Sequence, residues 1–187
     1  MDLTRIKKLI DDFKSINVKN ISTEPTFMDI AGFPHYENVC SNILKFFFQS
    51  EETHGLKDLF IQALLKAIGE KTNHEIIVNE VIREQVTNKG NRIDIVIITD
   101  EFVVGIENKI YAGVYNDLDD YSAYLNSMKN DRNLYRVILS IYSIPSNDSG
   151  FVNIRYSEFF SNIDKLIGDY WHDGNQKYLV YLKDFMQ

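Results

Sequence analysis

The chain has 187 residues, of which 44% are hydrophobic and 13% aromatic, and its formal net charge at pH 7 is −7. This length allows one substantial core and leaves no room for a second full domain, so we predict a single domain over residues 1–187. The negative charge argues against a protein that binds nucleic acid through a broadly basic surface, but it does not exclude a local binding site.

The first part of the chain shows helical periodicity. Apolar residues recur at intervals of three and four in residues 3–15, which predicts an amphipathic helix. Proline and glycine then punctuate residues 17–34, which predicts a connecting loop. Two further helices are predicted over residues 36–49 and 56–68, and Gly69 follows the second helix at the position where a helix end favours glycine.

After the second of these helices the hydrophobic period changes from about 3.6 residues to about 2. β-branched residues predict three consecutive strands over residues 76–86, 92–99 and 102–110, joined by short turns into an antiparallel meander. A helix is predicted over residues 115–129. The strand that follows, over residues 134–142, would lie parallel to the third strand if that helix forms a crossover.

The rest of the chain predicts a short fifth strand over residues 151–156, then two helices from Ser157 with a break near residues 173–175. This order predicts an α/β fold with a mixed sheet of four to five strands flanked by helices. The predicted domain comprises an N-terminal helix and loop, a core, and a C-terminal strand with helices, over residues 1–35, 36–142 and 143–187.

The sequence lacks the signals of a membrane protein, a disulfide framework and a histidine metal site. Its apolar runs are far shorter than the roughly 20 residues that a membrane span needs, and the N-terminus lacks the apolar region of a signal peptide, so we predict a cytoplasmic protein without a membrane partner. The single cysteine, Cys40, excludes a disulfide framework and predicts a buried thiol. No paired metal-ligand spacing is present among the histidines, which are His35, His54, His74 and His172.

Three charged residues interrupt the apolar second and third strands. Strand alternation places Glu107 and Lys109 on one face of the third strand. It also places Asp94 on the face opposite Ile93 and Ile95 of the second strand. A buried charge is costly unless it is paired or binds an ion, so these side chains either form a structural salt bridge or bind a cation.

The cation interpretation has a definite chemistry. Two nearby carboxylates repel each other, and Mg²⁺, or Mn²⁺ in its place, relieves the repulsion by binding both while it keeps several waters. Such an ion polarises a phosphodiester and lowers the pKa of a bound water. Lys109 would then stabilise the negative charge that develops in the transition state.

The two strands also carry a wider motif. Residues 91–97 read Asn-Arg-Ile-Asp-Ile-Val-Ile, and residues 105–111 read Gly-Ile-Glu-Asn-Lys-Ile-Tyr. Together they resemble the active-site hairpin of the PD-(D/E)XK nuclease superfamily, and more narrowly a bacterial branch that reads Arg-Ile-Asp and then Ile-Glu-Asn-Lys-Ile. With Glu37-Asn38 and His54-Gly55-Leu56 upstream, and Leu118 and Tyr121 downstream, the resemblance covers roughly residues 36–142. It implies a restriction-endonuclease-like core and Mg²⁺-dependent cleavage of nucleic acid.

Residue by residue, the resemblance implies that Asp94 and Glu107 bind the metal and that Lys109 is the catalytic lysine. It implies further that Glu37 supplies a third ligand, directly or through water. The alternative for Glu37 is a purely structural role, because a glutamate in the first turn of a helix also stabilises the helix dipole.

The chain departs from the family pattern at two positions. Ile93 stands in place of the proline of the superfamily's name, which leaves the carboxylate of Asp94 intact. Asp117 stands where this branch often has glutamine, and together with Tyr121 we predict it as an accessory residue. An aspartate there adds negative charge where an amide would contact phosphate or orient Lys109, which would weaken the binding of DNA.

Further polar residues lie near the predicted hairpin. Glu80 shares a face of the first strand with Glu84, and one of them could point at the cation, with a solvated sheet edge as the alternative. A local positive patch that could contact the phosphate backbone is formed by Arg83, Lys89 and Arg92, although a solvated turn explains these three equally well.

We therefore predict a metal-dependent nuclease that acts on DNA, with nucleic acid as its partner. Two alternatives stay open: a catalytically inactive binding module that keeps the nuclease fold, and an RNA-directed nuclease. Many enzymes of this fold cut both strands as dimers, so the resemblance also makes a homodimer an expected arrangement, although the sequence shows no assignable interface.

Overall fold

The computed structural model describes residues 24–33, 36–110, 117–145 and 149–187. The helix predicted over residues 3–15 lies outside the described residues.

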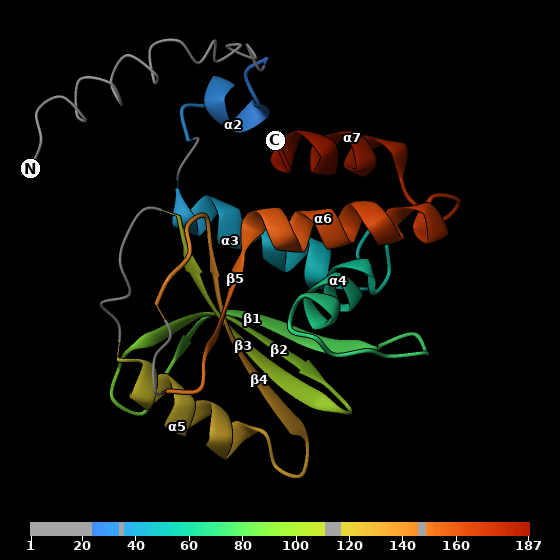
Figure 1. Cartoon of the computed structure of the whole chain (residues 1–187). Coiled ribbons are helices and arrows are strands. Elements are labelled where there is room, and N and C mark those ends of the chain that lie inside the picture. The colour runs from blue at the N-terminus through green and yellow to red at the C-terminus, as the bar shows by residue number, and fades with distance from the viewer. Residues whose placement is uncertain (1–23, 34–35, 111–116, 146–148) are drawn as a thin grey trace, which may run out of the picture.

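A five-stranded mixed sheet forms the middle of the fold (Figure 1). Its strands, in spatial as well as sequence order, are β1 (Val78–Val86), β2 (Arg92–Thr99), β3 (Phe102–Lys109), β4 (Asn133–Ser140) and β5 (Val152–Arg155). The first three strands form an antiparallel meander, β4 runs parallel to β3, and β5 runs parallel to β4. The predicted α/β class, the meander and the parallel fourth strand are confirmed.

Helices cover both faces of this sheet. They are α2 (Phe27–Ile30), α3 (Glu37–Phe48), α4 (Leu59–Ala67), α5 (Leu118–Met128), α6 (Tyr156–Leu166), the 3₁₀ helix η1 (Ile167–Tyr170) and α7 (Gln176–Phe185). Figure 1 shows α3, α4 and α6 over one face and α5 over the other, with α2 and α7 as an outer layer. In the described part of the chain, no helix is long and apolar enough to cross a membrane.

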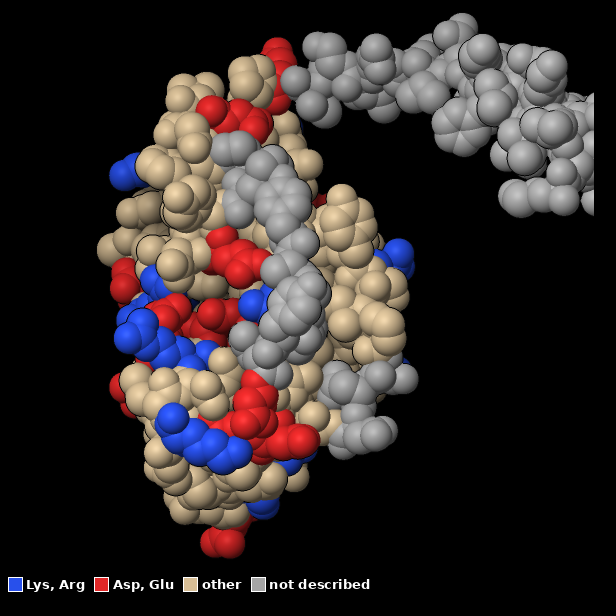
Figure 2. Space-filling model, turned by 90° about the vertical axis from the view of Figure 1, so that its left-hand side faces the viewer, with Lys and Arg blue, Asp and Glu red and all other residues tan. Residues whose placement is uncertain are grey.

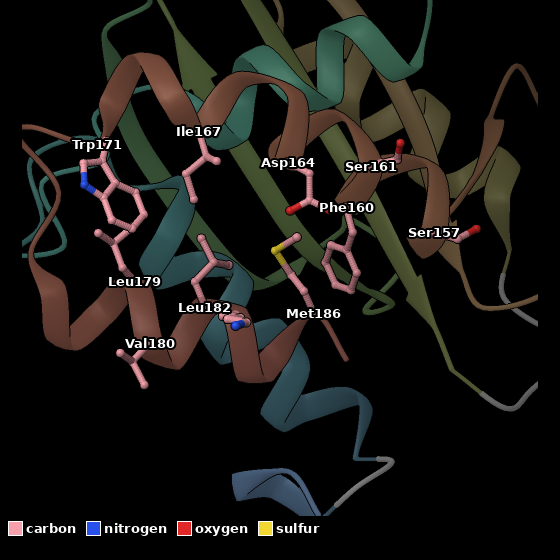
Figure 3. A pocket seen from close by; sticks show the side chains of 11 residues that line it. Ser157, Phe160, Ser161, Asp164, Ile167, Trp171, Leu179, Val180, Leu182 and Met186 are labelled. Atoms are coloured by element: carbon pink, nitrogen blue, oxygen red, sulfur yellow. The ribbon is translucent and has the colours of Figure 1, made fainter. Parts of the chain in front are cut away.

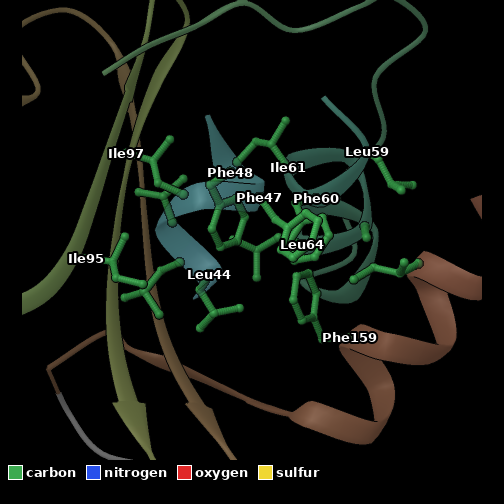
Figure 4. Packing of buried hydrophobic residues seen from close by; sticks show 14 of the residues in the cluster. Leu44, Phe47, Phe48, Leu59, Phe60, Ile61, Leu64, Ile95, Ile97 and Phe159 are labelled. Carbon is green, nitrogen blue, oxygen red and sulfur yellow. The ribbon is translucent and has the colours of Figure 1, made fainter. Parts of the chain in front are cut away.

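The larger core lies between the sheet and the layer of α3, α4 and α6 (Figure 4). On α3, apolar residues recur at the spacing of one helical face, and Phe47 and Phe48 are both fully buried. The ring of Phe47 stacks on Phe60 of α4 at 4.9 Å between centroids, and the ring of Phe48 stacks on Phe159 of α6 at 6.0 Å. Burying each such side chain contributes roughly 1.5–3 kcal/mol. These rings therefore hold α3 firmly against its neighbours.

Two predicted elements begin later than their sequence patterns indicate. Helix α4 starts at Leu59, because Gly55 and Lys57 have positive φ angles of 68° and 46°, which a helix does not allow. The carboxylate of Asp58 accepts hydrogen bonds from the main-chain N–H of Ile76, at 2.8 Å, and from the Tyr170 hydroxyl, at 3.0 Å. Ile76 is thereby bound to the turn before α4, and β1 starts two residues after it.

Helix ends account for two other findings. The loop predicted over residues 17–34 contains the short helix α2, so the prediction is wrong for residues 27–30. Thr26 and Asp29 form a capping box at its start, a signal that the sequence contains. The C-terminal end of α4 is the second case. Gly69 has a φ angle of 87°, and its predicted place after the end of α4 is confirmed.

A pocket of about 630 Å³ opens between α6, η1 and α7. Figure 3 shows Leu182 of α7 and Met186, which follows the end of α7, turned toward the helix that carries Phe160 and Asp164, with Trp171 at one end. Its lining is predominantly apolar and includes none of the charged residues predicted for the site. The chemistry predicted from the sequence therefore belongs to another part of the fold.

Replacing Gly105 with alanine tests how closely α5 packs on the sheet. An alanine Cβ at this position of β3 would lie 2.3 Å from Cδ1 and 2.9 Å from Cδ2 of Leu125 on α5. We expect Gly105→Ala to lower the free energy of unfolding by about 1–3 kcal/mol, because the core must shift to admit the methyl group. Urea denaturation measures this change.

Gly168→Ala is the matched control, since a Cβ there meets no atom within 4 Å among the described residues. Its free energy of unfolding should stay within about 0.5 kcal/mol of the wild-type value. Equal effects of the two substitutions would show that α5 does not pack against Gly105 as the structure has it.

Candidate active site

Glu107 and Lys109 lie at the end of β3, a strand in which all eight residues are buried. The ammonium Nζ of Lys109 is 2.7 Å from Oε1 of Glu107, so the two side chains share one face as alternation predicts. Glu107 is 0% exposed and Lys109 is 9% exposed. The pair is therefore a buried ion pair at one end of the sheet.

Asp94 joins this pair through the main chain of β3. Its Oδ2 accepts a hydrogen bond of 2.7 Å from the N–H of Asn108, the residue between Glu107 and Lys109. Regular pairing of β2 with β3 extends only to Ile95 opposite Ile106. Beyond that pair, the N–H of Asn108 donates to the Asp94 carboxylate and not to a backbone carbonyl of β2. This bond brings the two acidic residues to the same end of two neighbouring strands.

The alternation of β2 breaks at Asp94. Ile95 belongs to the core on the α3 side of the sheet, whereas Ile93 belongs to the smaller cluster on the α5 side. The prediction that Ile93 and Ile95 share a face is therefore wrong. At the same place on the neighbouring strand, between Arg83 and Gln85, Glu84 has a φ angle of 53°, a strained conformation for a residue other than glycine.

Glu37 reaches the same site from the first turn of α3. Its Oε1 accepts a hydrogen bond of 2.9 Å from the N–H of Ile110, and its Oε2 lies 3.7 Å from Nζ of Lys109. The position in the first helical turn also suits the helix dipole, so the structural role and the role in the site occur together. Glu37 and Ile110 are 73 residues apart in the sequence, and the packing of α3 on the sheet brings them together.

Burial and mutual repulsion shift the pKa values of these groups. Burial and, to a smaller extent, the charge of Asp94 raise the pKa of Glu107, Lys109 opposes both effects, and the result is a pKa of about 7. Burial also raises the pKa of Asp94, against the hydrogen bond from Asn108. For Lys109, burial lowers the pKa, but the hydrogen bond to Glu107 and the surrounding carboxylates outweigh burial, so the pKa lies above its ordinary value. The site thus holds excess negative charge around a charged lysine.

A divalent cation would reduce this repulsion. Asp94 and Glu107 offer hard oxygen donors, and Mg²⁺ in proteins commonly uses one or two carboxylates and keeps several waters. Within the described residues, no group of three or more His, Cys, Asp or Glu side chains is arranged to hold a metal ion. Asp94 and Glu107 therefore offer the type of donor that Mg²⁺ uses, whereas binding of the ion and a third protein ligand stay predictions.

The shifted pKa of Glu107 predicts a pH-dependent stability in the absence of cations. Its folded-state value of about 7 exceeds its ordinary value of 4.5, so the folded protein binds this proton more tightly than the unfolded chain does. The resulting stability is fully present below about pH 4.5 and is lost as the pH rises through about 7. The shift corresponds to about 3 kcal/mol, and urea denaturation in a chelator between pH 5 and 8 measures the loss.

Glu107→Gln is the control for this pH profile, because it removes the titrating group and keeps the shape. The difference in unfolding free energy between the wild type and Glu107→Gln should change steadily across this range. A difference that does not vary with pH would contradict the assigned pKa shift.

The predicted accessory residues have other partners. Asp117 caps α5, since its Oδ1 accepts a hydrogen bond of 3.0 Å from the N–H of Asp120, and its Oδ2 lies 3.2 Å from Nζ of Lys89. Tyr121 is buried, and its hydroxyl donates to the main-chain carbonyl of Arg92. Burial and the charges of Glu107 and Asp94 raise the pKa of Tyr121.

Glu84, and not Glu80, is the acidic residue of β1 that lies near Asp94. Glu80 is exposed and pairs across the strands with Ile98. The charge of Glu84 instead contributes to the raised pKa of Asp94. Its carboxylate oxygens each lie 3.5 Å from a guanidinium nitrogen, one of Arg83 and one of Arg92.

The predicted basic patch consists of residues that already have polar partners. Arg83 donates to the side-chain oxygens of Asn38, at 3.0 Å, and Asn42, and its side chain is only 17% exposed. Lys89 and Arg92 are exposed but lie against Asp117 and Glu84. The left side of Figure 1, turned to the viewer in Figure 2, shows acidic and basic side chains interspersed across its middle. This surface is mixed in charge and is not a uniformly basic one.

Buried polar residues behind the site were missed by the sequence reasoning. Asp120 of α5 accepts hydrogen bonds from the Thr87 hydroxyl, at 2.6 Å, and from the side-chain amide of Asn91, at 2.8 Å, and so ties α5 to the turn between β1 and β2. Asn108 and Ser41 are also buried, and they bind each other. The available signal was that Ser41 lies among the apolar residues of α3.

Comparison with protein families agrees with the motif. The family model described as the PD-(D/E)XK nuclease superfamily matches residues 26–187. Among solved structures, the chain is similar to the small subunit of the heterodimeric restriction endonuclease R.BspD6I, with 16% sequence identity and a TM-score of 0.38 over 76% of this chain and 87% of that chain. Curated proteins gave no match.

Proposed function

The chain belongs to the PD-(D/E)XK nuclease superfamily, and from this premise we propose that it is a Mg²⁺-dependent nuclease that hydrolyses phosphodiester bonds of DNA. One observation carries the proposal. Asp94, Glu107 and Lys109 come together at the buried end of two strands, where the carboxylates repel each other and a lysine ammonium lies 2.7 Å from one of them. A structural salt bridge alone would not require two carboxylates, one buried and one half-buried, beside one ammonium.

Each residue has a proposed role. Asp94 and Glu107 would hold the cation, with Mn²⁺ as a substitute for Mg²⁺. A bound cation would neutralise charge on the scissile phosphate and make water more acidic. Lys109 would bind a non-bridging phosphate oxygen through its ammonium and stabilise the charge that grows on it. Glu37, whose carboxylate lies 3.7 Å from Lys109, would orient that ammonium and reach the cation only through water.

The choice of substrate rests on the family resemblance. DNA is proposed before RNA because the motif resembles restriction-type enzymes, and Arg92 and Lys89 are the exposed basic side chains that a phosphate backbone could reach if it displaced their carboxylate partners. A homodimer, a cytoplasmic location and a single domain over the whole chain stay predictions.

The test is a cleavage assay with the full chain. Purified protein is incubated with supercoiled plasmid, single-stranded DNA and single-stranded RNA, each with Mg²⁺, with Mn²⁺ or with chelator. We expect metal-dependent cutting of DNA that is lost in Asp94→Ala. Cleavage of RNA alone would correct the substrate. Absence of cutting, together with no binding of either cation by calorimetry, would leave the inactive binding module as the better description.

A further inference from the structure

Asn108, the middle residue of the Glu-Asn-Lys segment, directs its side chain away from its two charged neighbours, as strand alternation requires. The residue is 0% exposed. Its Nδ2 donates to the main-chain carbonyl of Glu37, at 3.1 Å, and to Oγ of Ser41, at 3.0 Å. Its Oδ1 accepts a hydrogen bond of 2.7 Å from the hydroxyl of Tyr156. An asparagine amide has two N–H donors and one acceptor oxygen, and these partners engage both donors and the oxygen.

The main chain around Asn108 completes the connection. The N–H of Asn108 donates to Asp94, at 2.7 Å, and the N–H of Ile110 donates to the carboxylate of Glu37, at 2.9 Å. The end of β3 therefore fixes Asp94 by a main-chain bond and Glu37 at two points, its carbonyl and its carboxylate. Through Tyr156 the same amide also reaches the first turn of α6.

We propose that Asn108 is a positioning residue: it holds Glu37, and with it the first turn of α3, in place beside Asp94, Glu107 and Lys109. This inference rests on the proposed function, because it explains why Glu37 has to be held beside these residues. Asn108 binds the carbonyl of Glu37, the same residue whose carboxylate lies 3.7 Å from Nζ of Lys109. A side chain of equal size without an amide would fill the space but would leave the Glu37 carbonyl and the Tyr156 hydroxyl without this partner.

Asn108→Leu in the full chain is the test, and the fold supplies a matched control. The side-chain amide of Asn153 on β5 also makes three hydrogen bonds: its Nδ2 donates to the carbonyl of Ile138, at 3.1 Å, and to Oγ of Ser140, at 2.7 Å, and its Oδ1 accepts from the main-chain N–H of Ile144, at 2.8 Å. Asn153→Leu thus removes an equivalent set of bonds without touching Glu37.

The first measurement is amide hydrogen exchange at Ile110, followed by NMR without cations, because this N–H reports whether the Glu37 carboxylate is in place. We expect about 10-fold faster exchange, or more, in Asn108→Leu and little change in Asn153→Leu. The second is calorimetric affinity for Mn²⁺, which should fall about 10- to 100-fold in Asn108→Leu, as for other residues that orient ligands. In a Glu37→Gln background the same substitution should change this affinity much less.

The possible outcomes separate the two proposals. Unchanged exchange at Ile110 in folded Asn108→Leu overturns the positioning role, even if the wild type cuts DNA. If the wild type neither binds a cation nor cuts, the proposed function fails, and exchange still decides whether Asn108 holds Glu37. If Asn108→Leu does not fold, Ser41→Ala decides, because it removes one partner of the same amide: faster exchange at Ile110 supports the role and unchanged exchange refutes it.

Discussion

Lys109→Met is expected to lower the rate of DNA cleavage by about 100- to 1,000-fold, the effect of removing one group that stabilises transition-state charge. Methionine keeps most of the aliphatic length and removes the ammonium that lies 2.7 Å from Glu107 and 3.7 Å from Glu37. Initial rates on supercoiled plasmid at saturating Mg²⁺ measure the loss. A decrease smaller than 10-fold would remove Lys109 from the chemistry.

The same substitution should also destabilise the protein when no cation is present. Without the ammonium, Glu107 loses the group that opposes its raised pKa, and breaking a buried ion pair by removal of one partner costs about 3–5 kcal/mol. Urea denaturation at pH 8 in chelator shows this loss, and it should shrink at pH 5, where Glu107 is protonated. Lys165→Met, which changes an exposed lysine of α6, is the control for rate and stability.

Asp94→Asn is expected to slow DNA cleavage strongly while it raises the stability of the protein. The amide oxygen of asparagine still accepts the hydrogen bond from Asn108, so the strand end keeps its geometry. The variant loses one of the two carboxylates proposed to hold the cation, and with it several kcal/mol of transition-state stabilisation. This loss corresponds to a rate of cleavage that is roughly 1,000-fold lower. In chelator at pH 8, removal of a buried like charge should raise the free energy of unfolding by about 1 kcal/mol.

The direction of the stability change separates the two interpretations of this cluster. If Asp94 served a structural salt bridge with Lys109, Asp94→Asn would lower stability and would leave cleavage to other residues. Calorimetry with Mn²⁺ adds a third observation, because the variant should bind the ion at least about 10-fold more weakly. A variant that is less stable, binds Mn²⁺ normally and still cuts would overturn the assignment of Asp94.

Elements with strong periodicity were predictable from the sequence. β2 was predicted with its exact bounds, and the meander followed from short turns between β-branched runs. The proximity of Glu107 and Lys109 followed from a period of two, which β3 keeps to its end. Such features depend on residues close together in sequence, which is why one sequence suffices for them.

Features that depend on distant partners could not be predicted in the same way. Alternation fails at Asp94 because its carboxylate is bound by an amide of the neighbouring strand, while Glu84 across from it adopts a positive φ. Arg83 was predicted to contact phosphate, but Asn38 and Asn42 on one face of α3 bind its guanidinium. These contacts become apparent only once α3 is placed on the sheet, and the sequence alone carries no signal for that placement.

The long sequence separations within the site bear on when it forms during synthesis. Asn108 binds Glu37 across 71 residues and Tyr156 across 48, so no part of this arrangement is local along the chain. Contacts between distant residues form late in folding, because the loop between them must close first. A nascent chain emerges from its N-terminus, so we expect Glu37 to remain solvated until β3 is made and the anchoring of Asn108 to be completed only after α6 has emerged. The proposed site would then be complete only late in biogenesis, after α6 has left the ribosome.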